Sequence, residues 1–331
     1  MIRIAQIGVG YWGPNLLRNL ISSPRCSLTH VVEMSADRRA FVNSAYPTVT
    51  TVENAGEVFA SADIDAVVIS TPAQTHHALA VAALSAGKHI LVEKPLATST
   101  AEIDEIAQIA KKTGRVAMVG HTFLYNPAVR YLKGLIDAGE LGDIRYIYSQ
   151  RLNLGRIRSD VDALWNLAPH DVSIIQYLLG DPMPTSVHRT GMDFVQKGID
   201  DVVFLTVAYP GKILAHVHVS WLDPHKVRSL TVVGSKKMAV YDDMAEHKIA
   251  VYDKGIEPKA VLGESMDYDQ MRPPAFVHRS GDVHFPAIQW QEPLKAEIDH
   301  FIDCIEGKAK CLTGPDHARE VVRILADAKP Q

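Results

Sequence analysis

The 331-residue sequence is poor in cysteine and contains no long apolar run. Its three cysteines, Cys26, Cys304 and Cys311, are an odd and scattered set. They have neither the density of a disulfide scaffold nor the paired spacing of a zinc site, so we expect reduced, structural thiols and predict no metal site. No apolar stretch approaches the ~20 residues that a membrane span requires, so no membrane partner is expected.

The chain also has little excess of charge, with a formal net charge of -4 and a pI near 6.4. Such a balance gives no general attraction for phosphate backbones, which argues against a nucleic-acid partner. The first residues, "MIRIAQIGVG", lack the charged, apolar and cleavage regions of a signal peptide in their required order. We therefore predict a cytoplasmic protein whose partner is a small molecule.

The residues that are present have the proportions of a globular protein, with 47% hydrophobic and 22% charged residues. The length exceeds one typical core and indicates two domains. From residue 2, short apolar runs alternate with helical stretches, which is typical of a parallel sheet with crossover helices. We expect five strands by residue 120 and an α/β dinucleotide-binding (Rossmann) domain over residues 1–122.

The pattern changes near residue 123, after which strand candidates follow one another with turn residues between them. Segregated runs of helix and strand predict an α+β domain with a largely antiparallel sheet over residues 123–331. Residues 255–290 contain four prolines and no clear period. This segment is predicted to be a long connection over the surface.

The stretch "GVGYWG" at residues 8–13 has the G-x-G-x-x-G pattern, follows an expected strand and opens an expected helix. Glycines there let the backbone approach a pyrophosphate, which the free N–H groups of the helix N-terminus then bind. A role of the glycines in a tight turn alone is the alternative. The loop residues predicted to bind the cofactor are Gly8, Gly10, Tyr11, Trp12 and Gly13.

Glu33 ends the second predicted strand, where a carboxylate would accept hydrogen bonds from the adenosine ribose. A carboxylate would also repel a ribose 2′-phosphate, which favours NAD over NADP. Arg38 and Arg39 follow closely and leave NADP as the less favoured cofactor. We include Arg38 among the predicted cofactor contacts.

Two further stretches, "STPAQTH" at 70–76 and "VEKP" at 92–95, follow strands whose carboxyl ends meet at the same sheet edge. Thr71, Pro72 and His76 are predicted to line the nicotinamide side, with a purely structural His76 as the alternative. Glu93 and Lys94 are predicted at the same edge. The amine of Lys94 can donate a hydrogen bond to the oxygen whose carbon exchanges hydride.

In this order and spacing, "GVGYWG", "STPAQTH", "VEKP" and "WNLAPHD" resemble the glucose-fructose oxidoreductase and inositol dehydrogenase family, written Gfo/Idh/MocA. The resemblance covers essentially the whole chain. It implies that Lys94 contacts the reacting oxygen and that His170 acts as acid or base. Family members commonly carry an aspartate four residues before that histidine, whereas this chain has Asn166, which can orient but carries no charge.

The stretch around Asn166 also predicts a local structure. We expect Asn166 to cap a helix while facing the substrate, and Pro169 to fall in the first turn. His170 would then lie near the positive helix end and stay neutral, with a buried packing role as the alternative. The further residues predicted to bind substrate are Tyr125, Asn126, Arg156 and Trp165.

Arg151, Arg156 and Arg158 form the densest local positive charge, which suits phosphate or carboxylate groups or a solvated turn. With the family resemblance, they favour a nucleotide-linked sugar as substrate. The sequence thus predicts an NAD-dependent oxidoreductase that interconverts a sugar hydroxyl and a ketone. An NAD-dependent glycoside hydrolase and a non-catalytic dinucleotide sensor are the alternatives, and a homo-oligomer, dimer or tetramer, is expected.

Overall fold

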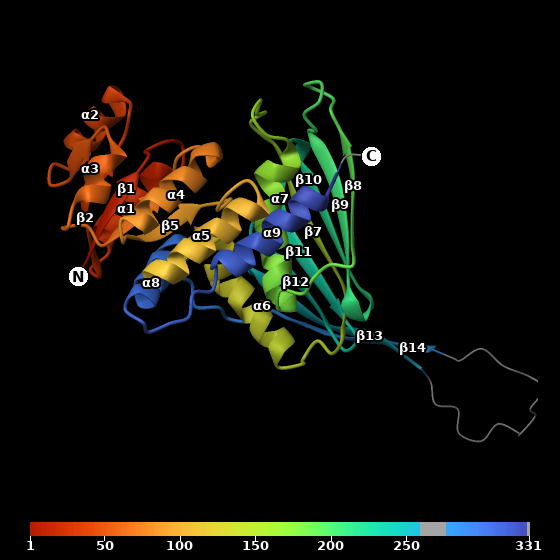
Figure 1. Ribbon diagram of the computed structural model, residues 1–331. Coiled ribbons are helices and arrows are strands. Elements are labelled where there is room, and N and C mark those ends of the chain that lie inside the picture. Colours follow the sequence, from red (N-terminus) through yellow and green to blue (C-terminus); the bar gives the residue numbers. More distant parts are fainter. Residues whose placement is uncertain (259–275, 330–331) are drawn as a thin grey trace, which may run out of the picture. The chain divides into compact units, whose positions relative to one another are not determined.

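The computed structural model describes residues 1–258 and 276–329 (Figure 1). Contacts divide the chain into two compact units. The first contains Met1–Pro127, Val172–Asp181 and Trp290–Lys329, so the last two helices pack with it although they follow the predicted boundary at residue 122. The described part of Ala128–Asp171 and Pro182–Gln289 forms the second unit. The predicted division into residues 1–122 and 123–331 stays a prediction.

The first unit contains a six-stranded, fully parallel sheet with the strand order β3-β2-β1-β4-β5-β6. This confirms the predicted Rossmann-type sheet and places its topological switch point between β1 and β4. The sequence predicted five strands and missed β3, which is too short at three residues to show a pattern. The strands are β1 (Ile2–Ile7), β2 (Cys26–Val32), β3 (Thr50–Val52), β4 (Ala66–Ile69), β5 (His89–Glu93) and β6 (Ala117–Gly120).

Local signals explain where the helices of this unit begin and end. Ser99 and Glu102 form a reciprocal capping box at the start of α5, and Gly114 ends the helix with a φ of 66°. Figure 1 shows α9 packed along α5. The helices of the unit are α1 (Gly13–Ser22), α2 (Ala36–Ala45), α3 (Ala55–Ala60), α4 (His76–Ser85), α5 (Thr100–Thr113), α8 (Pro293–Ile305) and α9 (Pro315–Asp327), with the short turns η1 (Ala73–Thr75) and η2 (Thr122–Tyr125).

The second unit contains an eight-stranded sheet with the order β14-β13-β12-β11-β7-β10-β9-β8. It is antiparallel except between β7 and β10, which confirms the predicted α+β architecture. The strands are β7 (Ile144–Leu154), β8 (Ser186–Met192), β9 (Val202–Tyr209), β10 (Ile213–Ser220), β11 (Leu222–Gly234), β12 (Met238–Asp242), β13 (Ile249–Pro258) and β14 (Phe276–His284). The other elements are α6 (Pro127–Asp137), the turn η3 (Pro210–Lys212) and α7 (Ala163–Leu179), whose last residues group with the first unit.

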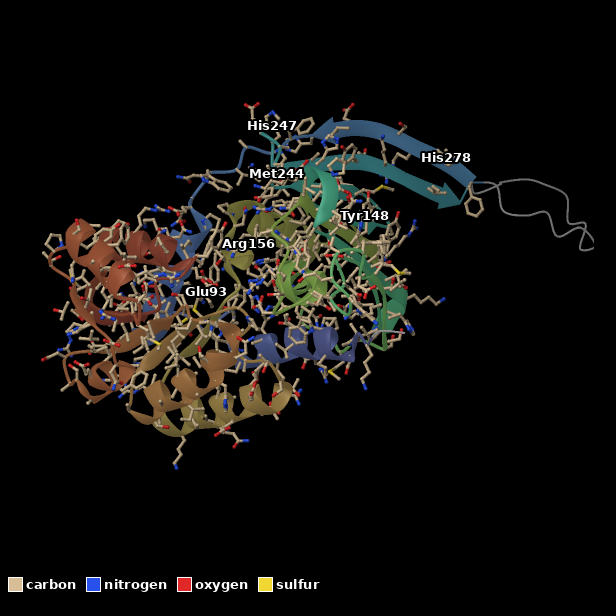
Figure 2. The ribbon with its side chains drawn as sticks, turned by 90° about the horizontal axis from the view of Figure 1, so that it is seen from above. Glu93, Tyr148, Arg156, Met244, His247 and His278 are labelled. Carbon is tan, nitrogen blue, oxygen red and sulfur yellow. The ribbon has the colours of Figure 1, made fainter. Side chains whose placement is uncertain are left out.

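The prediction of a long surface connection over 255–290 is wrong for residues 255–258 and 276–284. β13 and β14 pair there as an antiparallel ladder, visible as the two long ribbons beside His278 in Figure 2. The pattern was missed because residues of β14 are mostly exposed on both faces, so no apolar alternation marks the strand. Residues 259–275 of the predicted connection lie outside the described residues.

The large sheet buries one face and presents apolar side chains on the other. Along β9, Val203, Leu205 and Val207 are buried while the residues between them are not. On the opposite face Tyr146, Tyr148, Phe204 and Leu214 are 40 to 46% exposed, and Tyr148 is labelled in Figure 2. Among the residues that the structure describes, no helix is long and apolar enough to span a bilayer.

Candidate functional site

The glycine loop between β1 and α1 has a distinct physical requirement at each glycine. Gly8 has a φ of +92°, and a Cβ there would lie 2.8 Å from the Ser70 carbonyl oxygen. A Cβ on Gly13 would lie 2.8 Å from the Gly8 carbonyl oxygen, whereas one on Gly10 would meet no atom within 4 Å. Gly8 and Gly13 therefore permit tight packing, and Gly10 leaves open space where a pyrophosphate can approach the backbone.

Two features complete this cradle for a dinucleotide. Trp12 is the cap residue of α1 and provides no side-chain cap, so the first-turn N–H groups can serve a ligand anion. The buried Gln6 amide donates 2.9 Å hydrogen bonds to the carbonyls of Gly8 and Gly13 and thereby fixes the loop backbone. The sequence did not predict Gln6, because it lies within a strand and its partners are set by the turn. The loop fits the pyrophosphate of NAD.

Glu33 is held at the end of β2 as predicted. Its two carboxylate oxygens accept hydrogen bonds from the backbone N–H groups of Val9 (2.8 Å) and Ser35 (3.0 Å). Each oxygen retains a lone pair with which a ribose hydroxyl can bond. Arg39 binds the Glu33 and Met34 carbonyls, and Arg38 lies 3.8 Å from the Glu33 carboxylate. This arrangement favours the unphosphorylated ribose of NAD.

His76 supports the backbone, which is the alternative that the sequence left open for it. The imidazole is 1% exposed, with Nδ1 2.7 Å from the Pro95 carbonyl oxygen and Nε2 2.9 Å from that of Thr71. Burial lowers its pKa. The ring thus connects the segment after β4 with the segment after β5, and its nitrogens are turned to the protein. Pro72, between these contacts, is exposed at the sheet edge.

Glu93 and Lys94 follow β5 at the carboxyl edge of the sheet, where the sequence placed them. A Cβ on Gly120 of β6 would lie 3.4 Å from a Glu93 carboxylate oxygen, so the missing side chain makes room for this carboxyl group. Burial raises the pKa of Glu93 to about 7, against the opposing effects of Lys94 and a hydrogen bond from Trp12. Glu93, labelled in Figure 2, is therefore close to half-protonated at neutral pH.

A buried polar cluster adjoins these residues, and sequence reasoning missed it. Thr122 donates a 2.9 Å hydrogen bond to Glu297 of α8, whose side chain is fully buried. Burial and the neighbouring Glu93 raise the pKa of Glu297 well above its ordinary value. Burial, with smaller effects of His317 and Lys94, holds the pKa of His121 well below its ordinary value. Burial thus favours the uncharged form of both groups.

The position of His121 and Thr122, directly after the strand "VAMVG", was a usable signal for this cluster. Glu297 gave no such signal, because it is separated from Thr122 by 175 residues. Only the packing of α8 against η2 brings it to the sheet edge.

Tyr125 and Asn126, predicted to bind substrate, lie in and directly after the short turn η2. Both are buried in the first unit, and the Tyr125 hydroxyl is 2.9 Å from the Thr313 hydroxyl. Tyr125 thus pairs with the segment before α9. Their contact with the substrate stays a prediction.

The local structure predicted around Asn166 is also wrong. Asp162 caps α7, because its carboxylate accepts a 2.9 Å hydrogen bond from the N–H of Trp165. Asn166 lies inside the helix, where its side-chain oxygen accepts a 3.1 Å hydrogen bond from the Trp221 indole. An earlier aspartate at the better spacing displaced the asparagine from the cap.

Pro169 consequently lies in the helix interior and not in its first turn. A proline there cannot donate to the carbonyl one turn earlier, which is that of Trp165. His170 likewise lies in the middle of α7, so the field of the positive helix end does not reach it. The predicted reason for a neutral His170 therefore does not hold, and its role as acid or base stays a prediction.

The three arginines within and after β7 do not form one basic cluster. Arg151 is buried and donates a 2.6 Å hydrogen bond to Asp171, and Arg158 pairs with Asp160 at 2.5 Å. Arg156 is exposed on the segment after β7 (Figure 2). Of the three, Arg156 is the one that the structure leaves best suited to bind an anionic substrate group.

Two stretches of the chain match models of a known protein family. Residues 2–121 match the model of an oxidoreductase family described as GFO_IDH_MocA, NAD-binding Rossmann fold. Residues 129–240 match the C-terminal domain of the same family. The chain belongs to the Gfo/Idh/MocA family. Its first unit is accordingly an NAD-binding Rossmann domain, which confirms the cofactor predicted from the glycine loop and Glu33.

Several relatives of this Gfo/Idh/MocA protein have named activities. A 4-carboxy-2-hydroxymuconate-6-semialdehyde dehydrogenase of Sphingobium sp. is 35% identical over 54% of this chain and 59% of its own. A UDP-N-acetylglucosamine 3-dehydrogenase of Acidithiobacillus ferrooxidans is 32% identical over 60% and 61%. A scyllo-inositol 2-dehydrogenase (NAD(+)) of Bacillus subtilis is 27% identical over 95% and 90%. The match spans little more than half the length of the first relative.

Solved structures share the whole fold. A protein of Magnetospirillum magnetotacticum MS-1 matches with a TM-score of 0.83 and 28% identity over 99% of both chains. GenD2 from gentamicin A biosynthesis, crystallised with NAD, matches with a TM-score of 0.81 and 21% identity over 99% of this chain and 93% of its own. Among the described residues, no group of three or more histidine, cysteine or acidic side chains could hold a metal ion.

Proposed function

We propose that this protein is an NAD-dependent oxidoreductase that interconverts a secondary hydroxyl and a ketone on a sugar. The observation that carries the proposal is the Glu93–Lys94 pair at the carboxyl end of β5, in a sheet whose glycine loop fits a dinucleotide. The names of the inositol and UDP-N-acetylglucosamine dehydrogenases support a sugar-like substrate.

In the proposed mechanism, NAD supplies the nicotinamide that accepts or gives hydride. Lys94 donates a hydrogen bond to the reacting oxygen and stabilises the negative charge that develops on it. His170 takes or returns the hydroxyl proton, and Asn166 orients the groups around it.

We further propose a nucleotide-linked sugar as substrate, with Arg156 binding a phosphate. Its guanidinium is exposed, and a planar fork suits phosphate oxygens. Trp165, partly exposed at the start of α7, is proposed to contact the sugar. We propose that copies of the chain associate as a homo-oligomer through the apolar sheet face. The cytoplasmic location stays a prediction from the sequence.

The test is a screen of nucleotide sugars, free sugars and inositols with NAD⁺ and NADP⁺, followed by absorbance of the reduced nicotinamide. We expect NADH to accumulate with one substrate class, and the Kd for NAD(H) to be lower than that for NADP(H). Sugar release without net NADH would instead support the glycoside hydrolase, and ligand binding without turnover would support the sensor.

Replacement of Lys94 or of His170 by alanine tests the assigned roles. Each substitution should lower kcat by ~10²- to 10⁴-fold, because a positioned proton donor or acceptor typically contributes that much to the rate. NADH affinity should change little. Turnover close to that of the unmodified enzyme in either variant would remove that residue from the mechanism.

A further inference from the structure

The structure brings together two of the cysteines that the sequence shows as scattered. Cys304 lies near the end of α8, and its Sγ is 3.4 Å from Nε2 of His300. The same nitrogen accepts a 3.1 Å hydrogen bond from the N–H of Leu312, the residue after Cys311. Cys304 and the backbone beside Cys311 therefore meet at one imidazole, which places the two cysteines close together.

Cys311 is held in this position by its own neighbours. Its Sγ lies 3.8 Å from the carbonyl oxygen of Ala117 in β6, and a Cβ on Gly314 would lie 3.8 Å from the same sulfur. Cys311 is partly exposed, and residues 306–308 of the connection between the two cysteines are exposed. Part of Cys311 is thus accessible to solvent.

The two thiols are chemically different from Cys26. Hydrogen bonding with Cys311, and to a smaller extent the neighbouring His300, lowers the pKa of Cys304 in spite of its burial, while the pKa of Cys311 is raised. Burial raises the pKa of Cys26, whose thiol contacts the Leu20 carbonyl at 3.5 Å. Because the thiolate is the reacting species, Cys304 is the nucleophile of the set.

We propose that Cys304 and Cys311 form a redox modification site at which a hydroperoxide converts the two thiols into a disulfide. The Cys304 thiolate attacks the peroxide O–O bond, forms a sulfenic acid and releases an alcohol or water once the leaving oxygen is protonated. The Cys311 sulfur then attacks the sulfenic sulfur and the hydroxyl group leaves as water. In total, two thiols lose two electrons and two protons, and the peroxide is reduced to alcohol and water.

The test uses the full-length protein treated with hydrogen peroxide and analysed by intact mass and non-reducing tryptic mapping. We expect a loss of two hydrogen atoms and one linked peptide pair that contains Cys304 and Cys311, both reversed by a thiol reductant. Cys26→Ser should form the same bridge at the same rate. Cys311→Ser should form none and should instead oxidise further at Cys304.

A second measurement compares alkylation of the reduced protein near neutral pH. Cys304 should react at least about tenfold faster than Cys26, because a larger fraction is thiolate. Equal alkylation and oxidation of the two cysteines, or absence of a Cys304–Cys311 link in Cys26→Ser, would overturn the proposal. Neither readout uses a sugar or NAD, so failure here is distinct from failure of the proposed oxidoreductase activity.

Discussion

At the scale of the residue, the protein places groups with shifted pKa values beside its proposed reaction site. Glu93 has a pKa raised to about 7 by burial, and burial favours the uncharged forms of Glu297 and His121 next to it. A site of this kind can change its charge within the physiological range without any exposed titrating group.

Glu93 should therefore make NAD⁺ binding depend on pH. Its carboxyl group is neutral below about pH 7 and negative above it. Since NAD⁺ carries a positive nicotinamide and NADH does not, the Kd of NAD⁺ should fall as the pH rises through this value. The Kd of NADH should change less. Calorimetric titrations across this range should show a flat NAD⁺ profile for Glu93→Gln and an unchanged one for the exposed control Glu57→Gln.

Asn166 offers a second residue-scale prediction. Asn166→Asp keeps the side-chain oxygen that accepts from the Trp221 indole, so the fold should be retained. The new carboxylate lies one helical turn before His170 and should raise the pKa of the histidine. The rising limb of kcat/KM against pH should then move to higher pH. Coincident limbs for the two proteins would show that position 166 is not coupled to the base.

At the scale of the element, α8 connects the end of the chain to the Rossmann sheet. Its first residues are tied to α1 by Glu292, which pairs with Arg18 at 2.6 Å. One face buries Leu294, Ile298 and Phe301, and Glu297 lies among them. Glu292 at its N-cap and Glu297 within it thus lie in opposite environments, the first exposed and paired with a cation and the second buried.

These two glutamates should affect stability with opposite pH dependence. The pKa of Glu297 is raised above 4.5, so its contribution is fully present below that pH and is lost as the pH rises. Arg18 lowers the pKa of Glu292, so its contribution is present above 4.5 and is lost as the pH falls. The Glu297→Gln variant should therefore have a higher Tm than the unmodified protein, by a margin that grows between about pH 5 and pH 8.

Glu292→Gln is the matched control on the same helix. Its Tm should be lower than that of the unmodified protein at neutral pH, and the two Tm values should approach each other in acid. Thermal melts of the three proteins over this pH range test the predicted direction of both Tm differences. A Tm difference for Glu297→Gln that does not grow with pH would contradict a buried, protonated Glu297.

At the scale of the whole molecule, the open face of the large sheet presents exposed aromatic and aliphatic side chains. Tyr148 lies beside Thr231 and His216 in the register of three neighbouring strands. Its ring also stacks on Tyr146 with centroids 6.3 Å apart. Exposed aromatic groups on a flat sheet are typical of surfaces that bind another protein.

Tyr148→Arg should therefore shift the proposed homo-oligomer toward the monomer. In the oligomer, the arginines of two copies would face one another or lose their hydration at the interface, and either effect disfavours association. Light scattering after size exclusion gives the mass of each variant. Phe41→Arg, at a more exposed aromatic position on α2 in the first unit, should leave the mass unchanged. The same loss of mass in both variants would place the interface elsewhere.

The sequence by itself determined the features that depend on neighbours along the chain. Apolar periodicity indicated the parallel and antiparallel sheets, and the spacing of Gly8, Gly10, Gly13 and Glu33 indicated the NAD cradle, because both are properties of short segments. Tertiary structure decided which of the polar residues are buried and with which partners they pair. Arg151 is neutralised by Asp171, and Tyr125 is turned to Thr313. Glu297 reaches Thr122, and Cys304 meets Cys311, because α8 and the segment after it pack on β6 and η2. Burial and long-range pairing set charge and reactivity, and neither is encoded in the spacing of residues within one segment.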